Sequence, residues 1–170
     1  ASADSFLLNR QIRVPKINKI KYYLPILYIL LLAGVIKAQS YQWAKSIGSI
    51  SSDYSYSIAI DGNGNVLLTG SFGSTADFDP GPGMAQLTGA GLNDIFFAKY
   101  DNSGNYLWAK SIGGIACKGE GHSVAIDSSG NVLLTGYFSR TANFDPGPDT
   151  AYLTAIDFYD IFFAKYDSSG

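Results

Sequence analysis

The sequence has few of the residues that stabilise small folds without a large core. Its single cysteine, Cys117, cannot form a disulfide within the chain and leaves an unpaired thiol in an expected loop. It has one methionine and one histidine, and only 15% of its residues are charged. Glycine (19), tyrosine (12) and phenylalanine (10) are plentiful instead. Because aromatic residues favour strands and glycine supplies the positive φ of tight turns, this composition indicates an all-β protein with little helix.

The chain also lacks an apolar run long enough to cross a membrane. Residues 22–36 (YYLPILYILLLAGVI) include Pro25 and fall short of the roughly 20 apolar residues that a transmembrane helix needs. They follow a basic stretch that ends at Lys21 and precede KAQS, in which Ala38 offers a cleavage position. This pattern predicts a signal helix within residues 1–38, and hence an exported protein, extracellular or at the cell surface. An uncleaved anchor and a buried core helix are the alternatives.

Basic charge is scarce after the N-terminal segment. Residues 1–38 hold six of the twelve Lys and Arg residues but only one of the fourteen Asp and Glu residues, so the rest of the chain carries a net charge of about −7. A surface without a basic stripe argues against a nucleic-acid partner. We expect no cofactor, and we expect membrane contact only through an uncleaved signal.

Two copies of one unit fill the rest of the chain. SIAIDGNGNVLLTGSFGSTADFDPGP (57–82) matches SVAIDSSGNVLLTGYFSRTANFDPGP (123–148) at an offset of 66 residues. DIFFAKYD recurs at the same offset, at 94–101 and 160–167. Because self-similarity at a fixed period is typical of repeat architectures, each copy is expected to be one supersecondary unit.

The turns inside each unit predict strands. Gly64, Gly104 and Gly130 each follow an Asp by three residues. Asp at the first position of a type I turn accepts hydrogen bonds from the next amides, and Gly at the fourth takes the left-handed conformation, so each turn predicts two antiparallel strands. The expected strands are 42–48, 56–61, 65–72, 94–101, 105–112, 122–127, 131–138 and 159–167.

Four strands per unit at a fixed period are typical of β-propeller blades. The predicted organisation is an N-terminal extension and signal peptide at 1–38, then two propeller repeats in 39–170, divided at about 41–104 and 105–170. With the SVAID strand innermost, the chain has an outer strand, a complete blade and three strands of another. Because a closed propeller needs about four to eight blades, and the chain stops at DSSG inside a hairpin turn, the sequence predicts a fragment of a larger propeller.

These units resemble the bacterial beta-propeller repeat called SBBP. GHSVAIDSSGNVLLTG (121–136) and DIFFAKYD are similar to its characteristic segments, and the resemblance covers residues 41–170. The sequence departs from the family pattern in two connections that carry FDPGP, Phe72–Asp94 and Phe138–Asp160. The resemblance implies a propeller fold on an exported or cell-surface protein, and it brings no shared catalytic residues.

FDPGP is either a joint or a binding site used twice. Proline fixes φ and biases the preceding residue toward extended geometry, so the string is a stiff turn that a Phe can plug onto the blade. Both copies keep the string while the following residues diverge, which favours a joint and makes the variable stretch the candidate for contacting a partner. The expected structural residues of the repeats are Trp43, Trp108, Phe78, Asp79, Pro80, Phe144, Asp145, Pro146, Gly64, Gly104 and Gly130.

The Asp turns imitate the start of a calcium loop. The weak calcium candidates are Asp61, Asn63, Asn65, Asp127, Ser129 and Asn131. An EF-hand needs Gly at position 6 and Glu at position 12, where the first copy has Val66 and Phe72. Turn chemistry explains these residues without a metal, so no metal is expected.

No catalytic constellation is visible. GHSVA approaches the Gly-x-Ser-x-Gly of a hydrolase elbow, but Ser123 begins a strand, whereas the elbow is a strand-to-helix turn. Glu120, His122 and Arg140 are the candidates that break the repeat. Recurring aromatic residues, such as Phe97 and its repeat counterpart Phe163, are expected in packing between blades rather than on a sugar-stacking platform. Lys99 and Lys165 are expected to solvate edge strands.

The sequence therefore predicts a secreted or cell-surface β-propeller scaffold, a binding or structural module with an unknown protein or carbohydrate ligand. One alternative is a part of a propeller enzyme whose active site lies in other blades. Another is a two-blade chain that assembles with further copies into a ring.

Overall fold

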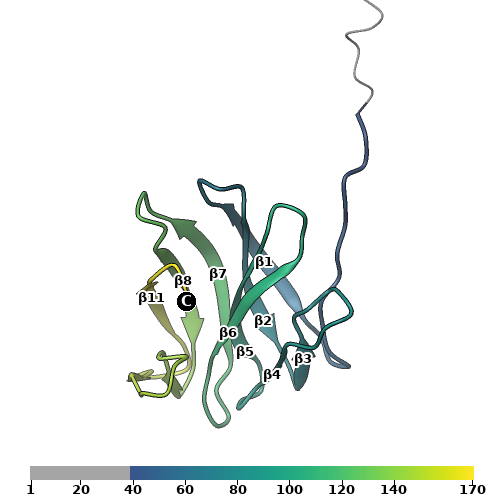
Figure 1. Cartoon of the computed structure of the whole chain (residues 1–170). Coiled ribbons are helices and arrows are strands. Elements are labelled where there is room, and N and C mark those ends of the chain that lie inside the picture. The colour runs from purple at the N-terminus through teal and green to yellow at the C-terminus, as the bar shows by residue number, and fades with distance from the viewer. Residues whose placement is uncertain (1–38) are drawn as a thin grey trace, which may run out of the picture. The chain divides into compact units, whose positions relative to one another are not determined.

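Two antiparallel sheets lie face to face in the computed structural model, which describes residues 39–170 (Figure 1). In each sheet, the long strands pair with their neighbours in chain order. The first blade has the order β1 (Tyr54–Ile60), β2 (Val66–Phe72), β5 (Asp94–Tyr100), β6 (Tyr106–Ile112), and the second blade has the order β7 (Gly119–Ile126), β8 (Val132–Phe138), β11 (Asp160–Tyr166). All seven strands lie where the turns and the period predicted them, which confirms an all-β fold with antiparallel blades.

The signal helix expected within residues 1–38 lies outside the described residues. Within the part of the chain that is described, no helix is long and apolar enough to span a membrane.

A small hairpin interrupts each long connection. It joins β3 (Thr75–Asp77) to β4 (Gln86–Thr88) in the first blade, and β9 (Thr141–Asn143) to β10 (Tyr152–Thr154) in the second. The FDPGP string lies in the loop of each hairpin. Strands of three residues are too short to display an alternating pattern, so the sequence indicated only a connection there.

The strand expected at 42–48 is absent. Its residues form only an isolated bridge, between Gly48 and Asp77. The repeat counterpart of this segment, at 107–113, supplies most of β6 and pairs with β5. A strand exists only where a partner completes its ladder, and no strand of the described chain forms a ladder with Trp43–Ile47.

The main core lies between the two blades. Leu67, Ile95 and Phe97 of the first blade pack against Val124, Phe138 and other apolar residues of the second. Cys117 lies in a loop, as expected, and its side chain is buried in this core.

A second core lies on the opposite face of the first blade. It contains Phe72, Phe78 and Phe96. Residues 95–98 of β5 are therefore buried on both faces.

Candidate functional site

The FDPGP loop is tied to the blade by matching hydrogen bonds in both copies. The Tyr100 hydroxyl donates to the Phe78 carbonyl at 3.0 Å, and the Tyr166 hydroxyl donates to the Phe144 carbonyl at 2.9 Å. Both phenylalanine rings are buried. This is the geometry that a joint requires.

Short-range hydrogen bonds also stabilise the Asp-Pro-Gly-Pro turn of each copy. Asp79 Oδ1 accepts from the Gly81 amide at 2.8 Å, and Asp145 Oδ1 accepts from the Gly147 amide at 2.7 Å. Pro80 and Pro146 lie inside these turns. The aspartates therefore bond to their own loops in both copies.

The calcium candidates are hydrogen-bonded within their own turns. Asp61 Oδ1 accepts from the amides of Asn63 and Asn65, both at 2.9 Å, and Asp61 Oδ2 accepts from the Asn65 side chain at 2.9 Å. Asp127 makes the same three bonds to Ser129 and Asn131. Gly64, Gly104 and Gly130 close their turns with φ between 76° and 84°, the left-handed conformation expected of them.

A lysine completes each of these two turns. Lys99 Nζ lies 2.9 Å from Asp61 Oδ2, and Lys165 Nζ lies 2.8 Å from Asp127 Oδ2. The prediction that Lys99 solvates an edge strand is wrong, because β5 lies between β2 and β6 and Lys99 is buried. The ammonium group takes the place beside the carboxylate that a cation would need.

Trp43 and Trp108 cover the glycine of the next hairpin turn. A Cβ at Gly104 would lie 3.1 Å from the Trp43 ring, and a Cβ at Gly170 would lie 3.0 Å from the Trp108 ring. The Trp43 indole N–H also donates to the Asn102 carbonyl at 3.1 Å. The two tryptophans thus pack in the same way, each against a hairpin turn, one repeat apart.

Several positions at which the two units differ in chemistry come together on one surface. Aligned at the repeat offset, Tyr54 corresponds to Glu120, Tyr56 to His122, Ser71 to Tyr137 and Asn93 to Tyr159. The rings contact one another in a chain that spans both blades. Their centroids lie 5.0 Å apart for Tyr56 and His122, 5.3 Å for His122 and Tyr137, 4.9 Å for Tyr137 and Tyr159, and 6.2 Å for Tyr54 and Tyr56. We call Tyr54, Tyr56, Glu120, His122, Tyr137 and Tyr159 the tyrosine cluster.

A β-bulge in each blade directs the central pair of this cluster. The register between β1 and β2 shifts between Ser55 and Ser57, and that between β7 and β8 shifts between Gly121 and Ser123. The extra residues are therefore Tyr56 and His122. Bulges re-aim side chains and are common beside functional sites. Ser123, expected at the start of a strand, lies inside β7 and pairs with Thr135.

Glu120 accepts hydrogen bonds at the centre of the cluster. Its Oε2 lies 3.0 Å from His122 Nε2, and its Oε1 lies 4.0 Å from Lys118 Nζ. Burial alone would raise the pKa of Glu120, but hydrogen bonds from Tyr137, His122 and Tyr56 hold that pKa below its ordinary value. The cluster thus stabilises a carboxylate among phenol rings, three of which are exposed: Tyr54, Tyr56 and Tyr159.

A pocket of about 340 Å³ adjoins the cluster at Tyr159. Its walls include Lys118, Arg140, Asp157 and Phe158. Arg140, the third candidate that breaks the repeat, thus lines the same pocket as Lys118, the residue that pairs with Glu120. Two cations and two aromatic rings line one hollow there.

Sequence reasoning identified Glu120, His122 and Arg140 but missed the tyrosines. The available signal was the position-by-position difference between the two aligned units. It shows Tyr137 against Ser71 and Tyr159 against Asn93.

Two comparisons with known proteins agree with the architecture. Residues 42–71 match the family model described as SBBP, the beta-propeller repeat. An uncharacterized WD repeat-containing protein of Acanthamoeba polyphaga mimivirus is 28% identical over 125 residues, which cover 64% of this chain and 9% of the relative. The chain therefore spans a small part of the length of this relative. These similarities and the meandering blades support a propeller-repeat architecture for this chain, in which residues 42–71 are similar to the SBBP repeat.

Proposed function

We propose that the chain is a secreted or cell-surface β-propeller scaffold that binds a carbohydrate at the tyrosine cluster and the adjoining pocket. The observation that supports this proposal is the concentration of repeat-breaking residues on one surface. Packing between blades needs the same residues in each copy. Residues that differ between the copies and gather in space are therefore candidates for a specific contact.

The chemistry of the surface fits a sugar. Tyrosine combines an apolar ring face with a polar tip, and the exposed rings of Tyr54 and Tyr159 can stack on the apolar face of a sugar ring. The Glu120 carboxylate can accept hydrogen bonds from sugar hydroxyls. Lys118 and Arg140 can pair with a carboxylate on an acidic sugar. Export rests on the signal pattern of residues 1–38.

Binding to an array of neutral and uronic-acid glycans tests the proposal, followed by titration calorimetry with the best glycan. We expect Tyr159→Ala to weaken binding at least tenfold, because the ring that joins the cluster to the pocket is lost. Arg140→Ala should remove the preference for acidic over neutral glycans. Tyr152→Ala is the matched control, since Tyr152 is an exposed tyrosine outside the cluster, and it should bind as the unmodified chain does.

Three results would contradict the proposal. One is the absence of binding to any glycan on the array. Another is glycan binding that Tyr159→Ala and Tyr56→Ala both leave unchanged. Capture of a protein through the cluster without glycan binding would also overturn the assignment of a carbohydrate.

A further inference from the structure

The outward face of the second blade exposes the residues that the first blade buries. Ile95 and Phe97 are 0% exposed, because they pack against the second blade. Their repeat counterparts, Ile161 and Phe163, are 86% and 89% exposed. The two strands have the same sequence, DIFFAKY. The second blade therefore presents the surface that joins the first blade to its neighbour, without a neighbour among the described residues.

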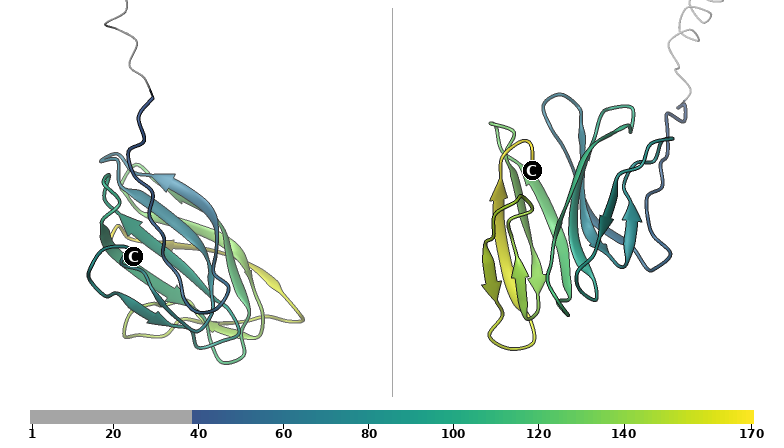
Figure 2. Two further views of the ribbon diagram at one scale, coloured as in Figure 1. Left: turned by 90° about the vertical axis from the view of Figure 1, so that its right-hand side faces the viewer. Right: turned by 60° about the horizontal axis from the view of Figure 1, so that its bottom comes forward.

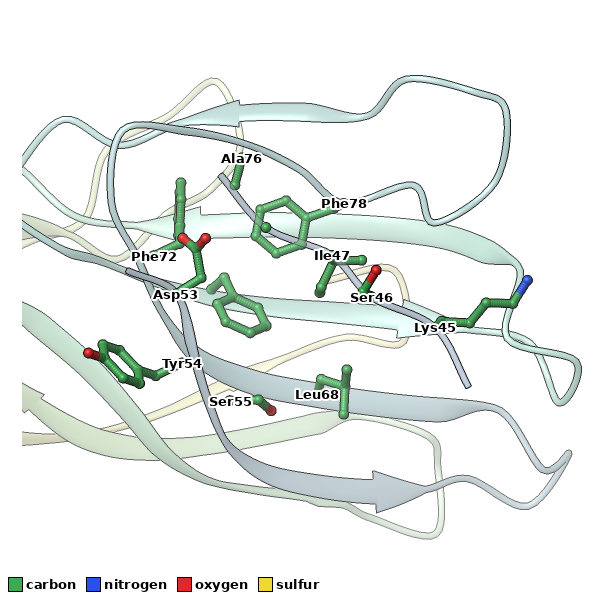
Figure 3. Close-up of a pocket in the computed structure, with 12 residues that line it drawn as sticks. Lys45, Ser46, Ile47, Asp53, Tyr54, Ser55, Leu68, Phe72, Ala76 and Phe78 are labelled. Atoms are coloured by element: carbon green, nitrogen blue, oxygen red, sulfur yellow. The ribbon is translucent and has the colours of Figure 1, made fainter. Parts of the chain in front are cut away.

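The outward face of the first blade is open in the complementary way. Ile58 is 62% exposed, whereas its counterpart Val124 is 6% exposed beneath the first blade. A pocket of about 230 Å³ lies on this face, with Ile47, Leu68 and Phe72 among its walls (Figure 3). A smaller pocket, of about 100 Å³, is lined by residues that include Trp43, Ile58 and Tyr100. We call these two pockets the hollows of the first blade.

In the second blade, the space that corresponds to the larger hollow is filled by Ile95. A Cβ at Gly119 or at Gly121 would lie 3.0 Å from the side chain of Ile95. Gly119 and Gly121 are the repeat counterparts of Asp53 and Ser55, which line the larger hollow. Ile95 of one blade thus occupies the site that the larger hollow leaves open on the other.

The space that corresponds to the smaller hollow is filled by Phe97. Its ring centroid lies 4.7 Å from that of Tyr166 and 5.6 Å from that of Trp108. Tyr166 and Trp108 are the repeat counterparts of Tyr100 and Trp43, which line the smaller hollow. The molecule therefore contains its own template for the occupants of both hollows, an isoleucine and a phenylalanine two residues apart.

The backbone edges match as well. β5 pairs with β6 so that Ile95 faces Ile112, Phe97 faces Lys110 and Lys99 faces Trp108. In the described chain, β11 pairs only with β8. Shifted by one repeat, the same register sets Ile161, Phe163 and Lys165 opposite three residues of the segment that has no strand partner: Ile47, Lys45 and Trp43.

Burying the outward face of the second blade would not leave an unpaired charge. Lys165 would become buried, and it already pairs with Asp127. The equivalent pair of Lys99 and Asp61 is buried in the first blade, with side-chain exposures of 11% and 7%.

We propose that the chain associates head to tail with a second copy of itself. Ile161 and Phe163 of one copy enter the hollows of the other, and the Trp43–Ile47 segment of that copy adds the fourth strand beside β11. The two surfaces of one copy cannot pair with each other, because β11 and the residues after Gln42 lie on opposite sides of the stacked sheets (Figure 2). The contact is heterologous, so an open assembly of any length keeps one unused surface of each kind, at its two ends, until a ring closes. This proposal is independent of carbohydrate binding.

Sedimentation of the full chain with two single variants tests the contact. We call the inserted residues, Ile161 and Phe163, the knob. Phe163→Glu disrupts the knob and leaves the hollows intact, whereas Ser55→Trp fills the larger hollow and leaves the knob intact. The unmodified chain should sediment as assemblies of more than one chain, and each variant alone as a single chain. An equimolar mixture of the two variants should form a heterodimer and nothing larger, because one intact knob and one intact hollow remain. Ile115→Glu is the matched control, since Ile115 is also 89% exposed, and it should behave as the unmodified chain does.

Several outcomes would overturn the proposal. An unmodified chain that stays monomeric at high concentration contradicts it directly. Association that survives both Phe163→Glu and Ser55→Trp would assign self-contact to another part of the chain, such as the apolar residues 22–36. A mixture that remains monomeric would show that the two surfaces do not meet. If Phe163→Glu is not folded by circular dichroism, Ile161→Asp takes its place and must give the same results.

Discussion

Lys99 and Lys165 are the same residue in the same local sequence, yet their surroundings differ. Lys99 Nζ and Asp61 form an ion pair inside the molecule, whereas the Lys165 side chain is 57% exposed beside Asp127. Removing one partner of a buried pair leaves the other charge without compensation. The exposed lysine keeps its water instead. The repeat thus provides two copies of one interaction at different depths.

We predict that Asp61→Asn lowers the free energy of unfolding by roughly 3 kcal/mol, because Lys99 is left buried without its carboxylate. Urea denaturation measures this loss. The matched control, Asp127→Asn, changes the same turn and should cost clearly less. Equal losses in the two variants would contradict the importance of burial.

The loss in Asp61→Asn should depend on pH. Burial alone raises the pKa of Asp61, but hydrogen bonds from Lys99 and Asn65 hold it well below its ordinary value of 3.8. A group with a lowered folded-state pKa stabilises the fold fully above its ordinary pKa, and this contribution is lost as the pH falls further. The difference between the unmodified chain and Asp61→Asn should therefore shrink below about pH 4.

At the scale of the element, each β-bulge requires a glycine on the strand with which it pairs. A Cβ at Gly136 would overlap the Glu120 carbonyl, and a Cβ at Gly70 would overlap the Tyr54 carbonyl. Both glycines belong to the repeated string VLLTG. The close approach of the bulged backbone explains why glycine stands at this point in both copies.

We predict that Gly136→Ala destabilises the fold by about 1–3 kcal/mol, because the methyl group forces β7 and β8 apart. It should also weaken glycan binding, since the displaced Glu120 belongs to the tyrosine cluster. Thermal unfolding and calorimetry measure the two effects. Gly62→Ala is the control: no atom lies within 4 Å of its added Cβ, so it should be nearly neutral. A stable, fully binding Gly136→Ala would contradict the assigned role of the bulge.

The long strands were predictable because each is bounded by an Asp-x-x-Gly turn and occurs twice. The segment at 42–48 was not, because pairing depends on a neighbour that a local pattern does not reveal. At the site, Glu120 and His122 were found as charged exceptions to the repeat. The contact between Tyr56 and His122 was not, because a bulge reverses the side to which following residues point, and neither bulge has a local sequence signal of its own.

At the scale of the molecule, the shared core should make the described blades unfold together. We predict that Phe97→Ala lowers the free energy of unfolding by roughly 3–5 kcal/mol, with tryptophan fluorescence and circular dichroism changing in one coincident transition. Phe163→Ala is the matched control in the same local sequence. In dilute solution it should change stability by less than about 0.5 kcal/mol. Two separate transitions would show that the blades unfold independently.

The duplicated strands also affect how the chain reaches its native state. Because β5 and β11 have the same sequence, β2 can form nearly the same ladder with either of them. The wrong pairing closes a longer loop, but loop-closure entropy grows slowly with length and disfavours this pairing by only about 1 kcal/mol. Correct folding therefore depends on the hairpins and bulge residues around each strand. These differ between the two blades and so favour the correct pairing.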